Sequence, residues 1–411
     1  METIISYGIF ISIVVFLNIL DYKKYKTILN PFFFLSIPFS IISLCCILLN
    51  NTIQFIAFFP LSLNLWSLGL ILFWIGGFIS SVLSSNFLMS NSLIEESSQN
   101  TLKNMRLINT LFFTCILISL LLILKNGGSD SFASKEMGEA IGQGGIAGRI
   151  SNILILAVPF YFASNFPRLI KYSIIIILFI CITAIGSKTW LTYSLLAGIV
   201  VIILGRKKIN LKFTLITFIL LFGTFSIYYK LNTNIEDNDH FIKFILRHFY
   251  FYVTSGVLPL SEIIRNDINF APGGIYHPFI ILVLYWLNPS SVSFHSSRWI
   301  TTDTLLGTQS NVYTFFGTLY LGGWPYDFII YSILSGLISY LYLYLYKIKK
   351  NIFYTIPYSF TLAILFFGWY NWGFSLLRIW EIYIYSFMLY VISQKKIRLF
   401  KPSSCLKNNQ E

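Results

Sequence analysis

Long apolar runs separated by short polar or basic stretches dominate the chain. A membrane-spanning helix needs about 20 mostly apolar residues. Eleven segments approach this length: 3–20, 30–49, 65–85, 107–124, 150–165, 172–185, 189–204, 212–229, 326–346, 352–372 and 376–393. Pro159 and Pro167 leave the division between the fifth and sixth segments open. The pattern predicts an all-α fold, a polytopic transmembrane helical bundle of about 11 spans within a range of about 10–14.

The composition excludes several other classes of protein. Of the 411 residues 56% are hydrophobic and 11% are charged, whereas soluble domains carry about 25% charged residues. A soluble enzyme, a secreted disulfide module and a disordered tail are therefore excluded. The net charge of +13 is typical of proteins that bind nucleic acid, but so apolar a composition argues against a nucleic-acid partner. Four of the five cysteines lie in the predicted spans, so no external disulfide framework is expected.

The basic residues between the spans follow the positive-inside rule. With an outer N-terminus, 19 of the 29 Lys and Arg residues fall in inner loops with four acids, and 10 lie with 12 acids on or near the outer face. Asp21 is among the four inner acids. The start Met1-Glu2 lacks the basic region of a signal peptide. The sequence therefore predicts a retained first span, an outer N-terminus and a cytoplasmic C-terminus.

This topology divides the chain into four parts. They are an N-terminal bundle (1–229), a large outer segment (230–307), C-terminal spans (308–393) and a cytoplasmic tail (394–411). In the outer segment, apolar residues recur at helical spacing: Phe241, Phe244, Ile245, Phe249 and Tyr252. Lys243 and Arg247 fall together on the other side, which predicts an amphipathic helix in the membrane interface.

Two further apolar stretches in the outer part are too short to span the membrane. Pro278–Leu287 is expected to be re-entrant, and the run that ends at Gly317 is expected to form a half-helix before the span at 326–346. Asp327 begins that span, and capping is its favoured role. Near the inner end of the span stand four tyrosines that are expected to form part of an interfacial belt: Tyr340, Tyr342, Tyr344 and Tyr346.

Several outer cations have no role in orienting the bundle. They are Arg149, Lys188, Arg247, Arg265, Arg298 and Arg378. Guanidinium groups bind pyrophosphate through bidentate, charge-assisted hydrogen bonds, whereas the alternative for each cation is a contact with lipid headgroups. A ligand role is favoured for Arg149, Lys188 and Arg247, which stand at span junctions or on the interfacial helix. The glycine-rich stretch 142–148 lacks the ending of a phosphate-binding loop, so it is expected to be a linker.

Three residues are candidates for a general base. His295 and His248 lie close to arginines in the sequence and titrate near neutral pH. Asp303 is the carboxylate alternative. Each histidine is equally compatible with an ordinary loop or interface position. The four histidines show no metal-ligand spacing, so no metal site is expected.

Four features of the chain resemble those of bacterial Wzy-type O-antigen and capsule repeat-unit polymerases. They are Gly144-Gly-Ile-Ala-Gly-Arg149, Ser187-Lys-Thr189, Arg247-His-Phe-Tyr-Phe-Tyr252 and Ser310-Asn-Val-Tyr-Thr-Phe-Phe-Gly317. The layout covers nearly the whole chain. The family often has Arg where this chain has Lys188. It often has an acidic residue where Gly322-Gly323-Trp324 stands, so Asp327 does not inherit that role.

The resemblance implies a metal-independent glycosyltransferase of GT-C-like architecture at the periplasmic face of the bacterial inner membrane. It needs no cofactor. Donor and acceptor are polyprenyl-pyrophosphate-linked oligosaccharides, and membrane lipids and a chain-length regulator protein are further partners. The residues implied for substrate or pyrophosphate binding are Arg149, Lys188, Arg247, Tyr250, Arg298, Asn311, Tyr313 and Arg378. The residues implied for catalysis are His295, His248 and Asp303.

Three other functions are alternatives to the polymerase. An O-antigen ligase uses the same donor, and composition does not separate the two enzymes. A lipid-linked oligosaccharide flippase is expected to place ionisable residues within its spans, and these spans are nearly free of charge. An acyltransferase is expected to carry a histidine deep in a span, whereas all four histidines lie between residues 240 and 295.

Overall fold

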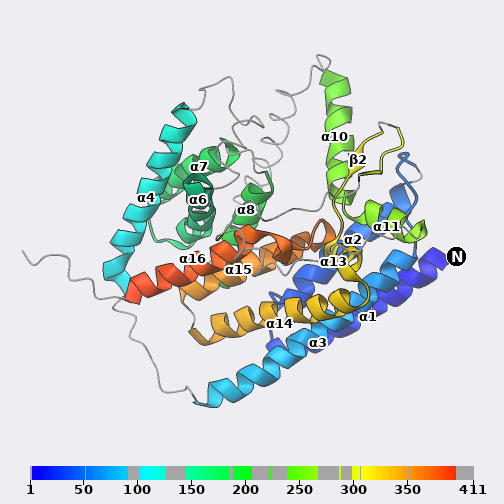
Figure 1. Cartoon of the computed structure of the whole chain (residues 1–411), viewed down its shortest axis with the longest axis horizontal. Helices are drawn as coiled ribbons and strands as arrows, with labels where there is room; N and C mark the ends of the chain where they lie inside the picture. Colours follow the sequence, from blue (N-terminus) through cyan, green and yellow to red (C-terminus); the bar gives the residue numbers. More distant parts are fainter. Residues whose placement is uncertain are drawn as a thin grey trace, which may run out of the picture.

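The computed structural model describes most of the apolar part of the chain. The described residues are 2–50, 52–90, 101–125, 145–184, 188–205, 223, 238–266, 287, 299–305, 307–349 and 351–394. Only the backbone is described for residues 85–90, 101–105, 145–147, 188, 238–241 and 394. Within this part the chain forms thirteen α-helices, two short 3-10 helices and one two-stranded ribbon (Figure 1). The predicted helical character is confirmed, with the small ribbon as the exception.

The first half of the described chain contains seven helices. They are α1 (Glu2–Tyr25), α2 (Pro31–Leu49), α3 (Leu61–Ser90), α4 (Thr101–Lys125), α6 (Gly145–Ala163), α7 (Arg168–Ala184) and α8 (Lys188–Leu204). The remaining helices are α10 (Asn238–Thr254), α11 (Val257–Arg265), α13 (Phe315–Gly323), α14 (Tyr326–Lys349), α15 (Ile352–Phe366) and α16 (Leu377–Gln394). The shorter elements are β1 (Ile300–Thr301), β2 (Gln309–Ser310), η3 (Phe367–Trp369) and η4 (Gly373–Ser375).

Ten of the eleven predicted spans coincide with helices, and the span at 212–229 lies outside the described residues except for Gly223. Six helical segments are long and apolar enough to cross a membrane: Glu2–Tyr25, Pro31–Leu49, Leu61–Ser84, Arg106–Lys125, Tyr326–Lys349 and Ile352–Trp369. Gly148–Ala163 and Thr189–Leu204 are shorter apolar helices. A multi-span membrane protein is therefore supported, while the number of eleven spans stays a prediction. The predicted half-helix is placed too early: the run that ends at Gly317 overlaps α13 only at residues 315–317, because the segment before it contains β2 and α13 continues to Gly323. The predicted re-entrant stretch Pro278–Leu287 lies outside the described residues except for Leu287.

Side-chain caps fix where several helices begin. The Asn30 side chain accepts from the Phe33 N–H at 2.8 Å, and Pro31 follows at the first helical position of α2. Thr314 caps α13 by accepting from the Gly317 N–H at 3.0 Å. Asp327 lies in the first turn of α14, where a carboxylate interacts favourably with the helix dipole. The polar residues that flank the apolar runs therefore define the ends of these helices.

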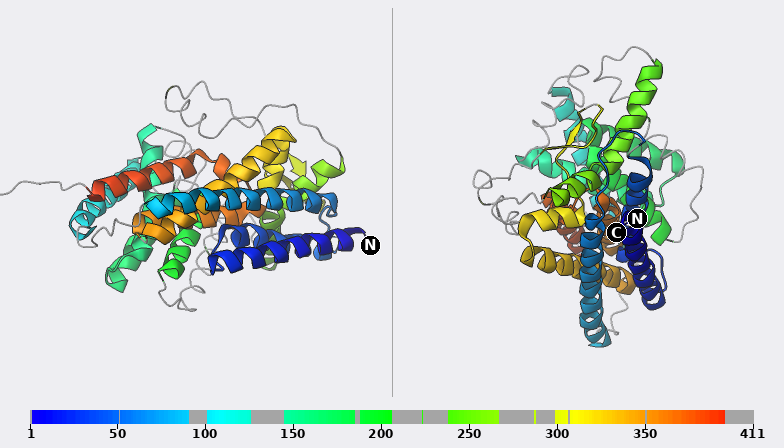
Figure 2. Two further views of the ribbon diagram at one scale, coloured as in Figure 1. Left: turned by 90° about the horizontal axis from the view of Figure 1, so that it is seen from below. Right: turned by 90° about the vertical axis from the view of Figure 1, so that its right-hand side faces the viewer.

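Glycines bring α3 and α14 into backbone contact. The two helices lie side by side, with α14 just above α3 in the lower part of Figure 1 (see also Figure 2). A methyl group on Gly76 would overlap the backbone of Ile333, and one on Gly336 would overlap the backbone of Phe73. Small residues permit such close approach between membrane helices. The contact between α3 and α14 is therefore made backbone to backbone at these glycines.

The segments between helices gather at two ends of the bundle. At one end, Arg247 of α10 donates to the carbonyl of Ile53, which follows α2. At the other end, Lys347 of α14 donates to the carbonyl of Tyr25 at 2.7 Å. The Tyr346 hydroxyl donates there to the carbonyl of Leu204 at 3.1 Å. The described segments that these contacts join were predicted to be outer at the first end and inner at the second, so the predicted alternation agrees with the contacts. Which end faces the cytoplasm stays a prediction.

The tyrosines of α14 do not form the expected lipid-facing belt. Tyr340 is 1% exposed and donates its hydroxyl to the carboxylate of Asp21. The Tyr344 hydroxyl lies 3.4 Å from that of Tyr25, and Tyr346 bonds to α8. The belt prediction is wrong here because partners for these hydroxyls lie inside the bundle.

Asp21 is also placed differently from the prediction. It was expected in an inner loop, but α1 continues to Tyr25 and leaves Asp21 2% exposed. Its second donor is the Trp74 indole N–H at 3.0 Å. Glu381 in α16, which was counted on the outer face, is likewise buried at 6% exposure. The described spans therefore contain two buried carboxylates, which weakens the argument from uncharged spans against a flippase.

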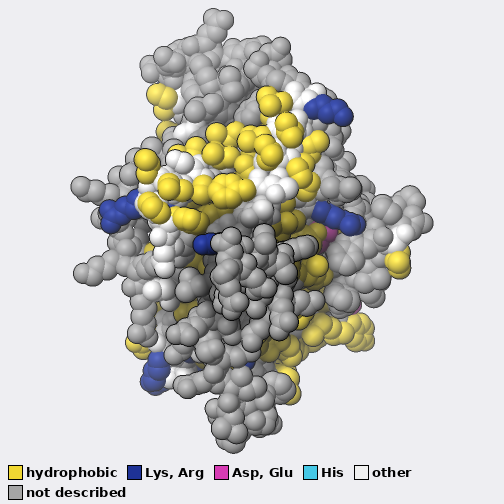
Figure 3. All heavy atoms as spheres, turned by 90° about the vertical axis from the view of Figure 1, so that its left-hand side faces the viewer, with side chains coloured by type: hydrophobic (Ala, Val, Ile, Leu, Met, Phe, Trp, Pro, Cys, Tyr) yellow, Lys and Arg dark blue, Asp and Glu magenta, His cyan; other side chains and the backbone are white. Residues whose placement is uncertain are grey.

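Much of the molecular surface is apolar. Figure 3 shows hydrophobic side chains across one face, with Lys and Arg at several of its margins. Exposed apolar residues of α4 and α7 include Leu117, Leu121, Leu124, Leu169 and Ile176. A soluble protein would bury such patches, whereas lipid chains solvate them. The surface therefore agrees with the apolar composition.

Candidate functional site

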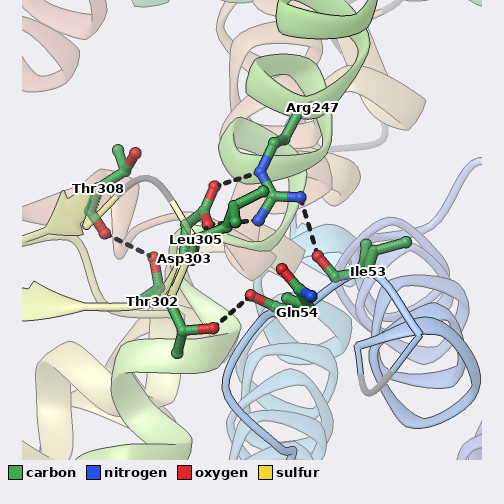
Figure 4. Close-up of polar contacts among 8 residues, drawn as sticks. Ile53, Gln54, Arg247, Thr302, Asp303, Leu305 and Thr308 are labelled. Carbon is green, nitrogen blue, oxygen red and sulfur yellow. Dashed lines mark hydrogen bonds and ion pairs between the residues drawn. The ribbon is translucent and has the colours of Figure 1, made fainter.

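Arg247 and Asp303 form a bidentate ion pair that joins α10 to the ribbon segment (Figure 4). The Arg247 Nε donates to Asp303 Oδ2 at 2.7 Å, and Nη2 donates to Oδ1. Arg247 Nη1 donates to the Ile53 carbonyl at 2.9 Å, and its guanidinium lies 4.9 Å from the Phe55 ring centre. One arginine thus holds together three segments that are far apart in the sequence.

Asp303 is buried within this junction. Its side chain is 1% exposed, and Oδ1 also accepts from the Leu305 N–H at 2.9 Å. The neighbouring Thr304 hydroxyl donates to the Gln54 carbonyl at 2.7 Å. A carboxylate whose two oxygens both accept from N–H donors, away from solvent, is suited to positioning Arg247. It is less suited to taking a proton from a substrate.

The side chain of Arg247 does not point where its position on α10 predicted. Lys243 and Arg247 were expected to share a polar face, and Lys243 is indeed exposed. The Arg247 side chain is only 19% exposed and turns toward the protein. Its contacts with described residues use three of its five N–H groups. Two donors and a partly accessible face therefore remain for an anionic ligand.

The residues after Arg247 are held by aromatic contacts and one phenolic bond. The His248 ring stacks on Phe244 and Phe251, with centres 5.2 and 5.6 Å apart, and meets Tyr252 edge-on at 5.2 Å. The Tyr250 hydroxyl donates to Asn50 Oδ1 at 2.6 Å. Burial, followed by the nearby Cys46 thiol, raises the pKa of the Tyr250 phenol. Tyr250 therefore stays a protonated hydrogen-bond donor, and His248 is half-buried beside Arg247.

The segment with Asn311 and Tyr313 lies against the same end of the bundle. The Ser310 hydroxyl donates to the Ser255 carbonyl at 2.8 Å, directly after α10. Tyr313 is 8% exposed and packs with Ile263 and Ile300. Asn311 is half-buried. The structure therefore brings Asn311 and Tyr313 to the region of Arg247, with Tyr313 mainly a packing residue.

A second group of polar residues surrounds Arg149 and Arg378. Both arginines lie near the start of their helices, α6 and α16. One turn further along, Asn152 of α6 donates to the buried carboxylate of Glu381 of α16. The Arg378 guanidinium lies 5.7 Å from the Trp190 ring of α8. Residues three apart share a helix face, so the Asn152–Glu381 bond brings the two arginine-bearing turns together.

The segment between α15 and α16 connects the two groups. Tyr193 of α8 has ring centres 5.4 Å from Trp190 and 5.2 Å from Phe367. The carbonyl of Trp369, the last residue of η3, lies against Gly256. A methyl group on Gly256 would overlap that carbonyl oxygen. Tyr370, the residue after Trp369, interacts electrostatically with Tyr252 of α10. The aromatic segment 367–375 therefore runs from the Arg378 group to the end of α10.

The structure does not describe the side chains of three predicted site residues. His295 and Arg298 lie outside the described residues, and only the backbone of Lys188 is described, at the start of α8. Arg265, another outer cation, pairs with Glu262 at 2.8 Å and donates to the Ala57 carbonyl. Among the described residues, no group of three His, Cys, Asp or Glu side chains is arranged to hold a metal ion.

Sequence reasoning missed several residues of these groups. They are Asn50, Phe55, Asn152, Trp190 and Glu381. Each meets its partner across a large separation in the sequence, 229 residues for Asn152 and Glu381. No local sequence pattern predicts such a pairing. Glu381 alone gave a signal, as an acid within an apolar run.

The two groups give a chemically coherent surface. Each contains arginine, a buried carboxylate and an aromatic ring beside an arginine; Arg247 bonds to its carboxylate directly, whereas Glu381 accepts from Asn152. Arginine guanidinium groups can bind an anion such as a pyrophosphate through charge-assisted hydrogen bonds. Aromatic rings beside it can contact sugar or lipid.

Comparisons with known proteins give one match. No curated protein and no solved structure is significantly similar to the chain. The sequence model of a family of unknown function, DUF6337, matches residues 52–399. The match includes every residue of the two arginine groups except Asn50, and it covers well over half of the 411 residues. The chain therefore belongs to the DUF6337 family of unknown function.

Proposed function

We propose that this protein is a polysaccharide polymerase that extends O-antigen or another surface glycan. It transfers the growing glycan from polyprenyl pyrophosphate to a hydroxyl of a new lipid-linked repeat unit. The proposal places the protein in the bacterial inner membrane, with its active site at the periplasmic end and its C-terminus in the cytoplasm. It rests on the residues that resemble Wzy-type polymerases and on their arrangement in space.

One observation carries the proposal furthest. Arg149, Arg247 and Arg378 come from separate parts of the chain that were predicted to be outer: Arg149 and Arg378 lie near the starts of α6 and α16, and Arg247 lies in the middle of α10. Arg247 pairs with the buried Asp303, and the Asn152–Glu381 bond lies one turn from Arg149 and Arg378. Two groups of cations connected by aromatic residues suit two lipid-linked substrates better than one.

The reaction that we propose forms one glycosidic bond. The hydroxyl oxygen of the acceptor sugar bonds to the anomeric carbon of the donor, and the bond from that carbon to the pyrophosphate oxygen breaks. The hydroxyl proton passes to a base, for which His248 and His295 are the candidates. Arginines stabilise the charge that develops on the leaving pyrophosphate. Asp303 positions Arg247 in this scheme and is no longer our candidate for the base.

The glycan profile of a deletion strain tests the proposal. We expect each surface anchor to carry a single repeat unit, because attachment continues without polymerisation. Complete loss of attached glycan would indicate a ligase or a flippase instead. In the complemented strain, Arg149→Ala should abolish long chains, whereas Lys243→Ala, an exposed cation on α10, should leave the ladder unchanged. Normal ladders from Arg149→Ala would refute the proposed pyrophosphate contact.

A further inference from the structure

A cavity of about 810 Å³ lies at the end of the bundle away from the arginine groups. It is formed where α1, α8 and α14 end and α15 begins, with Tyr25, Gly205 and Ile352 among its lining residues. Its volume lies within the range of about 300–1,000 Å³ that small-molecule sites occupy. The proposed polymerisation does not use this end of the molecule.

The lining is cationic and apolar. Among the described residues that line the cavity, the charged ones are Lys26 and Lys347, and none is acidic. The remaining walls are largely aliphatic: Leu29, Ala163, Val201, Ile202, Ile203, Leu204, Leu343 and Ile352. The hydroxyls of Thr27 and Thr355 supply further polar groups. An anionic group next to hydrocarbon chains would satisfy both parts of this lining.

The two lysines are held in place by the fold. Lys347 donates to the Tyr25 carbonyl at 2.7 Å, and its Nζ lies 5.3 Å from the Tyr25 ring centre. One of its three donors is used in this bond. Lys26 ends α1 with a φ of 52°, a left-handed conformation that favours glycine or asparagine. A lysine at this position keeps a cation at the rim of the cavity despite the conformational cost.

We propose that this cavity binds one anionic phospholipid, with its phosphate between Lys26 and Lys347 and its acyl chains along the aliphatic wall. Basic pockets between membrane helices are a recurrent way of binding such headgroups. The aliphatic wall favours a lipid over a free phosphate ion. The site is separate from the proposed active site and holds a lipid that is not a substrate.

Native mass spectrometry of the full-length protein in detergent tests this site. Phosphatidylglycerol and phosphatidylcholine with the same acyl chains are titrated separately. We expect one phosphatidylglycerol to bind more tightly than phosphatidylcholine. Each lysine near a headgroup contributes a factor of about five in affinity. Lys26→Gln should therefore weaken binding by about fivefold, and the variant Lys26→Gln/Lys347→Gln by about 25-fold.

Controls separate this site from general attraction to the basic end of the protein. Lys349→Gln removes an exposed cation from the same end of α14 that does not line the cavity, and it should leave binding unchanged. Ile202→Trp puts a bulkier side chain into the lining of the cavity. It should weaken lipid binding because less room remains for an acyl chain. Equal binding of both lipids, equal losses in Lys349→Gln and Lys26→Gln, or full displacement of the lipid by inorganic phosphate would each overturn the proposal.

Discussion

Arg247 and Asp303 show how one ion pair serves two purposes. They lie 56 residues apart in the sequence, and their pairing fixes α10 against the ribbon and the segment after α2. A buried carboxylate that loses its cation is strongly destabilising, whereas apolar replacement of both partners is tolerated. Because Arg247 also keeps free donors on a partly exposed face, its positioning role and its ligand role are separable by mutation.

Substitutions at this pair distinguish the two roles. Arg247→Ala should lower the free energy of unfolding by about 3 kcal/mol, because Asp303 stays buried without its partner. Arg247→Met/Asp303→Leu should recover most of that stability. Unfolding in detergent gives the stability, and glycan ladders give the activity. We expect the double variant to fold and yet make no long chains. Normal ladders from it would show that Arg247 does not contact the substrate.

A second residue-scale prediction concerns the Asn152–Glu381 bond. Glu381→Gln removes the charge and retains the size, so α6 and α16 should stay together. If Glu381 orients Arg149 and Arg378 through charge, Glu381→Gln should reduce polymer length in ladders while protein abundance in the membrane stays unchanged. Glu381→Leu removes the hydrogen-bonding group as well and should reduce both. Equal ladders from Glu381→Gln and the wild type would assign Glu381 a purely structural role.

At the scale of elements, the contact between α3 and α14 depends on glycine. Gly76→Ala should destabilise the protein by about 1–3 kcal/mol, because the new methyl group meets the Ile333 backbone, which has no rotamer to change. Thermal unfolding in detergent measures the loss. Gly8→Ala is the matched control, since no atom lies within 4 Å of the added methyl group. A Gly76→Ala variant as stable as Gly8→Ala would mean that α3 and α14 separate at little cost.

The elements also show what the sequence reveals of the fold. Apolar runs predicted nearly every described helix, because membrane helices must satisfy their own backbone hydrogen bonds. The short helix α13 was predicted only in part, because the glycine that was taken as the end of the run, Gly317, lies in its first turn. The sequence did not predict that Arg247 points inward or that Tyr340 is buried. Their partners, Asp303 and Asp21, are distant from them in the sequence. Helical spacing predicts on which face of a helix a residue lies, but it does not identify the residues that pack against that face.

At the scale of the whole molecule, the two ends of the bundle predict a topology test. Thr304→Cys lies at the end with the arginine groups, and Lys349→Cys lies at the other, and both side chains are exposed. A membrane-impermeant thiol reagent added to intact cells should label Thr304→Cys once the outer membrane is permeabilised, and it should label Lys349→Cys only after lysis. The wild-type chain, treated with the same reagent, measures the background labelling of its own cysteines. The reverse pattern would invert the proposed orientation and remove the active site from the periplasm.

The bond network around Asp21 has a consequence for biogenesis. α1 is synthesised before α3 and α14, yet one donor to its carboxylate comes from α3 and the other from α14, 319 residues later. An ionisable group in an isolated membrane helix is costly until its partners arrive. Asp21 of α1 therefore reaches its final environment only after α14 has been made. A nascent chain that stops before α14 carries an incompletely satisfied acid, which gives membrane quality control a means of recognising unfinished copies.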